Sequence, residues 1–218
     1  LGVVLGGRLG EVLFYNPGYY HSHPLKILAV WEGGMSFHGG FLGRLVAMAL
    51  FAHRRNLRWL ALMDFIAPLV PPGLAFGRLG NFINQEAYGS PAPDWVVRLL
   101  PPFIRDQMWI DGAYAHPTFL YESLWNLAVF GLLLTWRRRN PVRGVLIFVY
   151  FVLYNFGRFL IESIRMDSSF TAGGFRVAQL AALGLILVGL AGIWWRKRTT
   201  TARYRDLPQE AAQSLHVR

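Results

Sequence analysis

An arginine, two asparagines and a glutamate follow a long apolar run in residues 77–89, which read GRLGNFINQEAYG. Arg78 is the most informative of them, because an arginine in hydrocarbon costs about 2.5 to 3.5 kcal/mol on insertion scales. Such a residue is kept where it faces a cavity, a partner or an anionic ligand. Asn81, Asn84 and Glu86 add hydrogen-bond donors and acceptors close by. The stretch therefore predicts a functional site that binds an anion.

Other polar residues stand at the ends of further apolar runs, on the same predicted side of the membrane. His38 and Gly39 open one run, and His116 opens another, with Glu122 a turn or two further along. Arginines are numerous in this set, and guanidinium groups bind phosphate oxygens in pairs, so we expect a phosphate ligand. The remaining members are Arg8, Tyr154, Arg158, Glu162 and Arg165.

The same residues also have structural interpretations. Ion pairs within the bundle would account for Arg8 with Glu11 and for Arg158 with Glu162. Residues 154, 158, 162 and 165 are spaced so that one helix would align them on a single face. Structural roles are also open for three further residues: His38 as a hydrogen-bonded packing residue, Asp64 as a structural or topological group, and Glu122 as the partner of an arginine.

The elements that position these residues are predicted to be membrane helices. Apolar residues make up 54% of the 218 and charged residues only 16%, whereas an average soluble domain has about 25% charged residues. A spanning helix needs about 20 mostly apolar residues. The candidate runs, of which the first two are short, are 1–15, 38–53, 59–80, 117–136, 143–163 and 176–195. The predicted fold is an all-α polytopic transmembrane helix bundle.

The net charge of +10 is distributed in patches that fix a topology. Arginines and lysines gather in residues 54–58, 137–143 and 196–205, and the positive-inside rule assigns these segments to the cytoplasm. Topology explains the basic residues sufficiently, so we expect no nucleic-acid partner. The predicted organisation is a bundle over 1–198, with an extracytoplasmic loop region at 81–116, and a solvated cytoplasmic tail at 199–218.

Cysteine is absent from the chain, which excludes a thiolate metal site or a cysteine nucleophile within it. The six histidines are scattered without the spacing of metal ligands. No phosphate-binding loop, dinucleotide fingerprint or serine-nucleophile motif is present. We expect no metal and no cofactor.

These motifs resemble those of the prolipoprotein diacylglyceryl transferase family. Residues 77–89 resemble its signature, and residues 36–40, 116–122 and 154–158 resemble its other blocks in the same order. The resemblance implies a bacterial inner-membrane enzyme with seven helices and a periplasmic head. Six runs are visible here, so we expect a further helix, bearing a family tyrosine, before Leu1.

The implied reaction transfers a diacylglyceryl group from phosphatidylglycerol to the lipobox cysteine of a prolipoprotein signal peptide. A thioether forms and glycerol 1-phosphate leaves. The resemblance and the chemistry together nominate Arg78 and Arg158 to stabilise the departing phosphate, and His38 as general base. The arginines alone could also favour the substrate thiolate.

The resemblance assigns less direct roles to the other matching positions. Those expected to orient the lipid or support the arginines are Gly39, Asn81, Glu86, Gly89 and Tyr154. Those expected to support the site are Arg8, His116, Glu122, Glu162 and Arg165.

Both substrates live in the membrane, so lateral openings between helices are expected to admit them. Gly39, Gly40, Gly73 and Gly77 are predicted to allow close helix approach or gating. Two other classes of protein remain as alternatives. A lipid transporter would also gather arginines, but its polar residues would continue through the bilayer, and a membrane scaffold would need none of them for activity.

Overall fold

Helices dominate the structure, a computed structural model that describes residues 1–166, 171–172 and 175–206. By their internal contacts the described residues fall into two units, one from Leu1–Trp59 and one from the described part of Leu60–Gln209. Each unit has its own helices and its own packing, so the two are taken in turn.

The first unit is a helical hairpin with an irregular connection. Its elements are α1 (Gly2–Gly10), a π-helical turn (Glu11–Tyr15), α2 (Pro17–Ser22), 3₁₀ turns at Pro24–Leu28 and Val30–Glu32, and α3 (Phe37–Arg54). Ser36 caps α3, because its hydroxyl oxygen accepts a hydrogen bond from the Gly39 amide at 3.2 Å. The cap fixes the start of α3 at Phe37, so His38 is the second residue of the helix.

Glycines allow α1 and α3 to pack backbone against backbone. A Cβ atom on Gly6 would lie 2.3 Å from the Gly39 carbonyl oxygen, and one on Gly43 would lie 2.2 Å from the Gly2 carbonyl oxygen. Both helices thus carry glycines four residues apart on the facing side, the small-residue pattern of closely packed membrane helices. The prediction of a close approach at Gly39 is confirmed.

The same prediction fails at other glycines. A Cβ on Gly73 or Gly77 would meet no described atom within 4 Å. At Gly40 the nearest atom, the Val3 carbonyl oxygen, would lie 3.4 Å away, which is ordinary contact. These three positions therefore do not need glycine for packing among the described residues.

The second unit contains most of the described helices. The first of them, α4 (Trp59–Ile66), continues through a 3₁₀ turn (Ala67–Leu69) into α5 (Val70–Asn84). Next come α6 (Asp94–Leu99), α7 (Pro102–Gln107), and strands β1 (Trp109–Ile110) and β2 (Ala113–Tyr114). The chain then forms α8 (Thr118–Arg138), α9 (Val145–Glu162), β3 (Thr171–Ala172), β4 (Phe175–Arg176), α10 (Val177–Thr199) and a 3₁₀ turn (Tyr204–Asp206). Each strand pair, β1 with β2 and β3 with β4, is an antiparallel hairpin.

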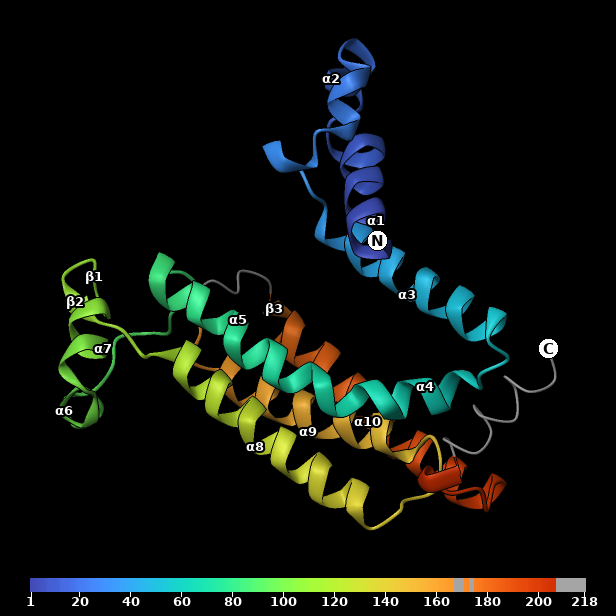
Figure 1. The fold of residues 1–218 in the computed structure, drawn as a ribbon. Helices are drawn as coiled ribbons and strands as arrows, with labels where there is room; N and C mark the ends of the chain where they lie inside the picture. The colour runs from blue at the N-terminus through green and yellow to red at the C-terminus, as the bar shows by residue number, and fades with distance from the viewer. Residues whose placement is uncertain (167–170, 173–174, 207–218) are drawn as a thin grey trace. The chain divides into compact units, whose positions relative to one another are not determined.

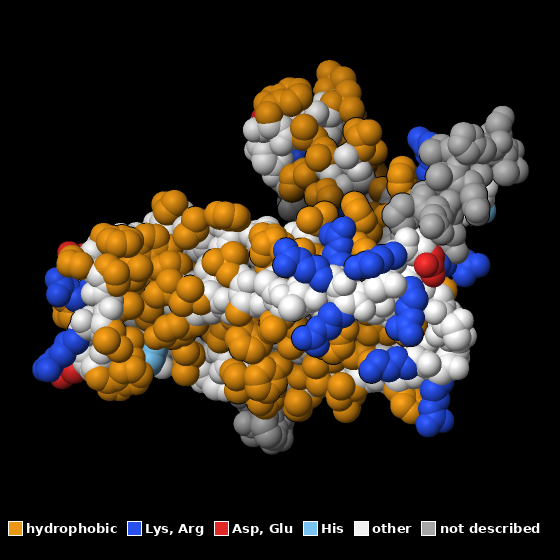
Figure 2. Space-filling model, turned by 60° about the horizontal axis from the view of Figure 1, so that its bottom comes forward, with side chains coloured by type: hydrophobic (Ala, Val, Ile, Leu, Met, Phe, Trp, Pro, Cys, Tyr) orange, Lys and Arg blue, Asp and Glu red, His pale blue; other side chains and the backbone are white. Residues whose placement is uncertain are grey.

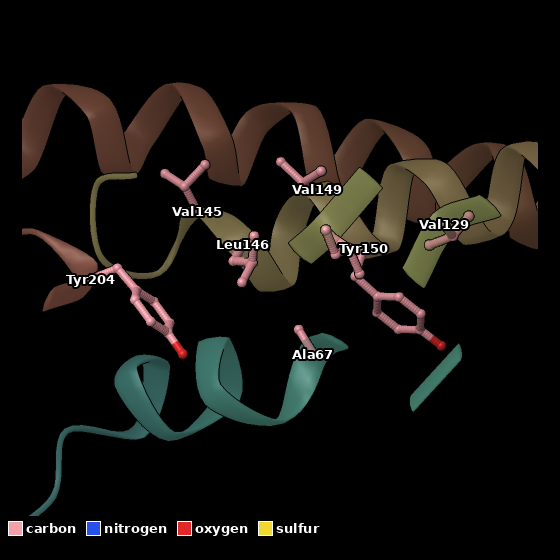
Figure 3. Close-up of a cluster of buried hydrophobic side chains, with 8 residues drawn as sticks. Ala67, Val129, Val145, Leu146, Val149, Tyr150 and Tyr204 are labelled. Atoms are coloured by element: carbon pink, nitrogen blue, oxygen red, sulfur yellow. The ribbon is translucent and has the colours of Figure 1, made fainter. Parts of the chain in front are cut away.

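Packing in the second unit follows the order α5, α8, α9 and α10, each helix contacting the next (Figure 1). The hydrophobic core lies toward the end of the unit where α8 leads into α9. Figure 3 shows this core, in which Ala67 and Tyr204 meet the buried face of α9 around Leu146. A smaller cluster of Ile104, Met108 and Phe119 joins α7 to the start of α8.

Four helices of the described chain are long and apolar enough to cross a membrane: Trp59–Asn84, Thr118–Arg138, Val145–Glu162 and Val177–Thr199. Their surfaces suit a lipid environment, and hydrophobic side chains cover broad areas of the face in Figure 2. The predicted all-α polytopic membrane fold is confirmed. The first two of the six predicted runs are also helical, but they are not among these four helices.

Asp64 has the structural role that the sequence allowed. It is fully buried, and its two carboxylate oxygens accept hydrogen bonds from the amides of Gly144 at 2.5 Å and Ile147 at 2.9 Å. These amides belong to the first turn of α9, whose donors have no partners inside the helix. Asp64 therefore caps α9 from a neighbouring helix.

Residues 200–206 are in part exposed and in part packed against the rest of the second unit. The Tyr204 amide donates to the Pro141 carbonyl oxygen at 2.9 Å, and the Arg143 amide donates to the Ala202 carbonyl oxygen at 2.9 Å. Tyr204 is buried in the core, and the Arg137 guanidinium lies 5.1 Å from the centre of its ring. The chain after α10 thus returns to the loop between α8 and α9. The predicted tail after 206 lies outside the described residues.

Candidate functional site

Glu122, in the second turn of α8, joins two arginines from different elements. Its Oε2 atom lies 2.5 Å from Nη2 of Arg78 on α5, and its Oε1 atom lies 3.4 Å from Nη1 of Arg165, after the end of α9. Glu122 is buried, and the Arg78 side chain keeps 20% of its surface exposed. Burial of a carboxylate is tolerated only with such partners. The interpretation that Glu122 pairs with an arginine is confirmed.

Arg158 forms a second ion pair on α9 itself. Its Nη2 atom lies 3.1 Å from Oε2 of Glu162, one turn later, and Glu162 is 2% exposed. The sequence also placed Arg165 on this helical face, which is wrong because α9 ends at Glu162. The turn that follows carries Arg165 to Glu122 instead. Arg176 holds this turn, since its Nη1 atom donates to the carbonyl oxygens of Glu162 and Arg165.

The polar residues after Arg78 divide between two local contacts. Nη1 of Arg78 donates to Oδ1 of Asn81 at 3.2 Å, one helical turn later. The Asn84 amide nitrogen donates to Oε1 of Glu86 at 3.2 Å, in an exposed position past the end of α5. Asn81 therefore orients Arg78 directly, whereas Glu86 is partnered by its neighbour. Contact of either residue with a lipid remains a prediction.

Gly89 has a packing role that the sequence did not specify. Its amide donates to the His116 carbonyl oxygen at 3.0 Å, and the next amide, of Ser90, donates to the Ile164 carbonyl oxygen at 2.7 Å. A Cβ atom on Gly89 would lie 2.7 Å from the His116 Cβ. Only glycine lets this segment pass between the start of α8 and the turn that carries Arg165. Its contact with substrate stays untested.

His116 stands where this segment meets α8. Its Nδ1 atom lies 3.1 Å from the hydroxyl of Tyr121, and burial lowers the pKa of the imidazole below its usual value. The contact with Tyr121 holds the His116 ring at the start of α8, and a role of His116 in supporting the site stays a prediction.

Arg8 does not pair with Glu11. Its guanidinium is buried, stacks on the ring of Tyr20 at 5.0 Å, and donates to backbone carbonyls of the segment that leads to α3. Glu11 instead accepts a hydrogen bond from Asn16 at 2.6 Å. The Arg8 guanidinium is thus occupied by hydrogen bonds to this segment, and Arg8 supports the segment's conformation. The carbonyls belong to Lys26, Ile27, Ala29, Gly33 and Gly34.

His38 lies in the first unit, at a groove between α1 and α3. Its Nδ1 atom is 3.2 Å from the hydroxyl of Tyr15, which ends the π-helical turn. The groove has a volume of about 740 Å³, and apolar side chains of both helices line most of it. His38 is exposed, so it is accessible to a reacting group in the groove.

The comparisons with known proteins decide the family. A family model described as prolipoprotein diacylglyceryl transferase matches residues 1–195. The chain belongs to this family. The predicted resemblance, and the prediction of a transferase, are therefore confirmed.

Named relatives agree over most of the chain, and each is a phosphatidylglycerol--prolipoprotein diacylglyceryl transferase. The protein of Symbiobacterium thermophilum is 52% identical over 192 residues, which cover 88% of this chain and 72% of that protein. The protein of Geobacillus kaustophilus is 46% identical, with 86% of this chain and 71% of that protein covered. The protein of Paraburkholderia phytofirmans is 40% identical, with 100% and 78% covered.

Among the predicted site residues of this family member, the second unit brings Arg78, Asn81, Glu122 and Arg165 into direct contact. Tyr154 and Arg158 line one small cavity with Glu122. Gly39, His38 and Arg8 belong to the first unit.

Two polar residues near these pairs escaped the sequence analysis. Arg176 is the first residue of the last apolar run, where a charge is ordinary at a membrane boundary. Asn126 lies inside an apolar run, four residues after Glu122. That spacing places Asn126 and Glu122 on one helical face, and it was the sequence signal that could have identified Asn126.

Proposed function

We propose that this chain transfers a diacylglyceryl group from phosphatidylglycerol to the lipobox cysteine of a prolipoprotein signal peptide. The observation that carries the proposal is the bridge from Glu122 to Arg78 and Arg165, beside the pair of Arg158 with Glu162. With Arg176, which donates to the Glu162 and Arg165 carbonyl oxygens, arginines outnumber carboxylates among the described residues of this cluster. The phosphodiester of phosphatidylglycerol is an anion that guanidinium groups bind well, and it would offset part of this positive charge.

The chemistry needs a cation at the leaving group and a base at the nucleophile. The cysteine thiol loses its proton, its sulfur bonds to the terminal glyceryl carbon, and the carbon–oxygen bond to phosphate breaks. The electron pair of that bond goes to the phosphate oxygen, so glycerol 1-phosphate leaves. Arg78 and Arg158 stabilise the charge that develops there.

His38 is the proposed general base. A histidine titrates near neutral pH, while a free thiol has a pKa of about 8.5, so proton removal by an imidazole suits the step. His38 is exposed beside an apolar groove, which is a suitable surface for a lipid-soluble substrate. Gly39 follows His38 on α3, and its missing side chain lets α1 and α3, which line the groove, pack closely.

The proposed setting is the bacterial inner membrane, with the arginine cluster toward the periplasm. The cluster lies at the C-terminal ends of α5 and α9 and the N-terminal end of α8. The basic segments 137–143 and 196–205 lie at the opposite ends of α8 and α10, where the positive-inside rule expects the cytoplasm. The proposed head is residues 81–116.

The test is release of glycerol phosphate by the full-length protein in detergent, given phosphatidylglycerol and a lipobox peptide. Release is expected to need the peptide thiol, so a peptide with alanine in place of cysteine gives none. Arg78→Ala should lower kcat at least about a hundredfold, as expected for loss of a charge-stabilising donor. Arg105→Ala, at an exposed pair with Asp106, is the matched control and should act like the wild type.

A folded wild-type protein that binds phosphatidylglycerol but releases no glycerol phosphate would contradict the transferase and favour lipid transport. Full activity in both Arg78→Ala and His38→Ala would favour a scaffold role for the polar cluster.

A further inference from the structure

A small cavity lies between α8 and α9, next to the ion pairs of Glu122 and Arg158. Its volume is about 10 Å³ as space for the centre of a water molecule, which is room for about one water. The proposed reaction does not use this cavity. The residues that matter for its chemistry are Glu122, Trp125, Asn126, Tyr154, Gly157 and Arg158.

Asn126 places a hydrogen-bond acceptor without a partner at this cavity. The residue is 2% exposed, and its Nδ2 atom donates to the Glu122 carbonyl oxygen at 2.7 Å. Its Oδ1 atom is buried and accepts no hydrogen bond from any residue in the described part of the chain. Buried polar atoms are nearly always hydrogen-bonded, so a donor is missing from this picture.

The neighbouring tryptophan cannot be that donor. Trp125 has a single N–H group, and it already donates to the Leu153 carbonyl oxygen at 2.9 Å. The indole is held in this position over Gly157, where a Cβ atom would lie 2.1 Å from the indole nitrogen. The indole N–H is thus committed to Leu153, and a small polar group inside the cavity would be able to supply the donor that Asn126 lacks.

We propose that the cavity holds one hydroxyl group, which donates to Oδ1 of Asn126 and accepts a hydrogen bond from Arg158. A hydroxyl both donates and accepts, which suits an acceptor on one wall and a guanidinium on the other. The group links Arg158 to Asn126, whose Nδ2 atom donates to the carbonyl oxygen of Glu122, the partner of Arg78 and Arg165. Asn126 is thus a positioning residue for the arginines, and this role rests on the proposed function.

The hydroxyl has two possible sources, a water molecule and the glycerol head group of phosphatidylglycerol. Asn126 lies one helical turn beyond Glu122, away from the start of α8 and so deeper in the proposed span. A head group bound by the arginines would need to reach past them to arrive there. This position favours water, and the assay below separates the two sources.

Asn126→Leu is the informative variant, with Asn155→Leu as its matched control. Asn155 is also a buried asparagine, and its Nδ2 atom donates to the carbonyl oxygen four residues earlier, that of Phe151, at 2.8 Å. It does not line the cavity. Asn126→Leu is expected to lower kcat for glycerol phosphate release about tenfold with little change in KM, the loss of about one good hydrogen bond to a charged group. Asn155→Leu is expected to stay within about twofold of the wild type.

A second lipid identifies the source of the hydroxyl. Phosphatidylpropanol has the phosphodiester of phosphatidylglycerol but no free hydroxyl on its head group. If water fills the cavity, Asn126→Leu slows the reaction of both lipids by the same factor. If the lipid supplies the hydroxyl, the wild type prefers phosphatidylglycerol and Asn126→Leu removes that preference. Either result supports the site.

Equal kinetics of Asn126→Leu and Asn155→Leu, in an assay where the wild type is active, would overturn the inference and leave the transferase intact. An inactive wild type would instead count against the proposed function. In that case an experimental structure of the full protein, with and without lipid, decides the site without activity. Density within about 3.2 Å of Oδ1 of Asn126 supports it, and its absence in both structures overturns it.

Discussion

A single carboxylate organises the arginines of this transferase-family chain. Glu122 contacts Arg78 from α5 and Arg165 from the turn after α9, so one side chain fixes two cations that come from distant parts of the sequence. In a low-dielectric interior, removing any one of these charged side chains destabilises the fold, because the remaining charges are left unbalanced.

Glu122→Gln is therefore expected to reduce both stability and activity. The neutral amide keeps the shape but loses the charge that holds Arg78 and Arg165. We expect a loss of about 3 kcal/mol in the free energy of unfolding, and a fall in kcat/KM for glycerol phosphate release of at least about tenfold. Thermal unfolding in detergent and the release assay measure the two effects.

Asp106→Asn provides the comparison for that experiment, because Asp106 forms an exposed pair with Arg105 at 3.2 Å. Exposed pairs contribute about 0 to 1 kcal/mol, so this variant should match the wild type. If Glu122→Gln also matched it in both measurements, Glu122 would not be organising the arginines.

At the residue scale, the sequence predicted which charged residues form ion pairs better than it predicted where Arg165 and Arg8 lie in the fold. It foresaw that Glu122 pairs with an arginine and that Arg158 can pair with Glu162, because charges in an apolar bundle need partners. It could not foresee that α9 ends before Arg165. Nor could it foresee that Arg8 donates to backbone carbonyls and does not pair with Glu11. Those outcomes depend on turns whose geometry no side-chain spacing encodes.

At the scale of elements, the two helices of the first unit depend on glycine more than on side-chain burial. Their backbones touch at Gly2, Gly6, Gly39 and Gly43, where any Cβ atom would collide with a facing backbone. The sequence predicted such an approach at Gly39 from composition. It could not tell Gly39 from Gly73 or Gly77, since only the packing partner decides whether a glycine is needed.

Gly43→Ala is expected to destabilise this hairpin, whereas its neighbour Gly40→Ala is not. The added Cβ at Gly43 would lie 2.2 Å from the Gly2 carbonyl oxygen, but at Gly40 the nearest atom is 3.4 Å away. Overpacking of this kind costs about 1 to 3 kcal/mol, because the helices must separate. Unfolding midpoints of the two purified variants in the same detergent measure the difference. Equal midpoints would show that the backbone contact is not required for stability.

At the scale of the whole molecule, four helices of the described chain are long and apolar enough to cross a membrane, and the distribution of charge supports the proposed orientation. The apolar runs were long enough to be read from the sequence, so the polytopic fold was predictable. The return of residues 200–206 onto the loop between α8 and α9 was not, because a polar, basic segment resembles a solvated tail until its partner is known.

The proposed orientation can be tested directly because the chain contains no cysteine, so one introduced thiol reports on one position. Asp111 and Arg139 are both exposed, the first between β1 and β2 and the second just after α8. The candidate span α8 separates them, so the proposed topology puts them on opposite sides of the membrane. We expect a membrane-impermeant maleimide to label Asp111→Cys in cells whose outer envelope layers have been removed and whose inner membrane is intact. Arg139→Cys should be labelled only after the inner membrane is opened. The reverse pattern would place the arginine cluster in the cytoplasm, away from exported prolipoproteins, and would contradict the proposed reaction.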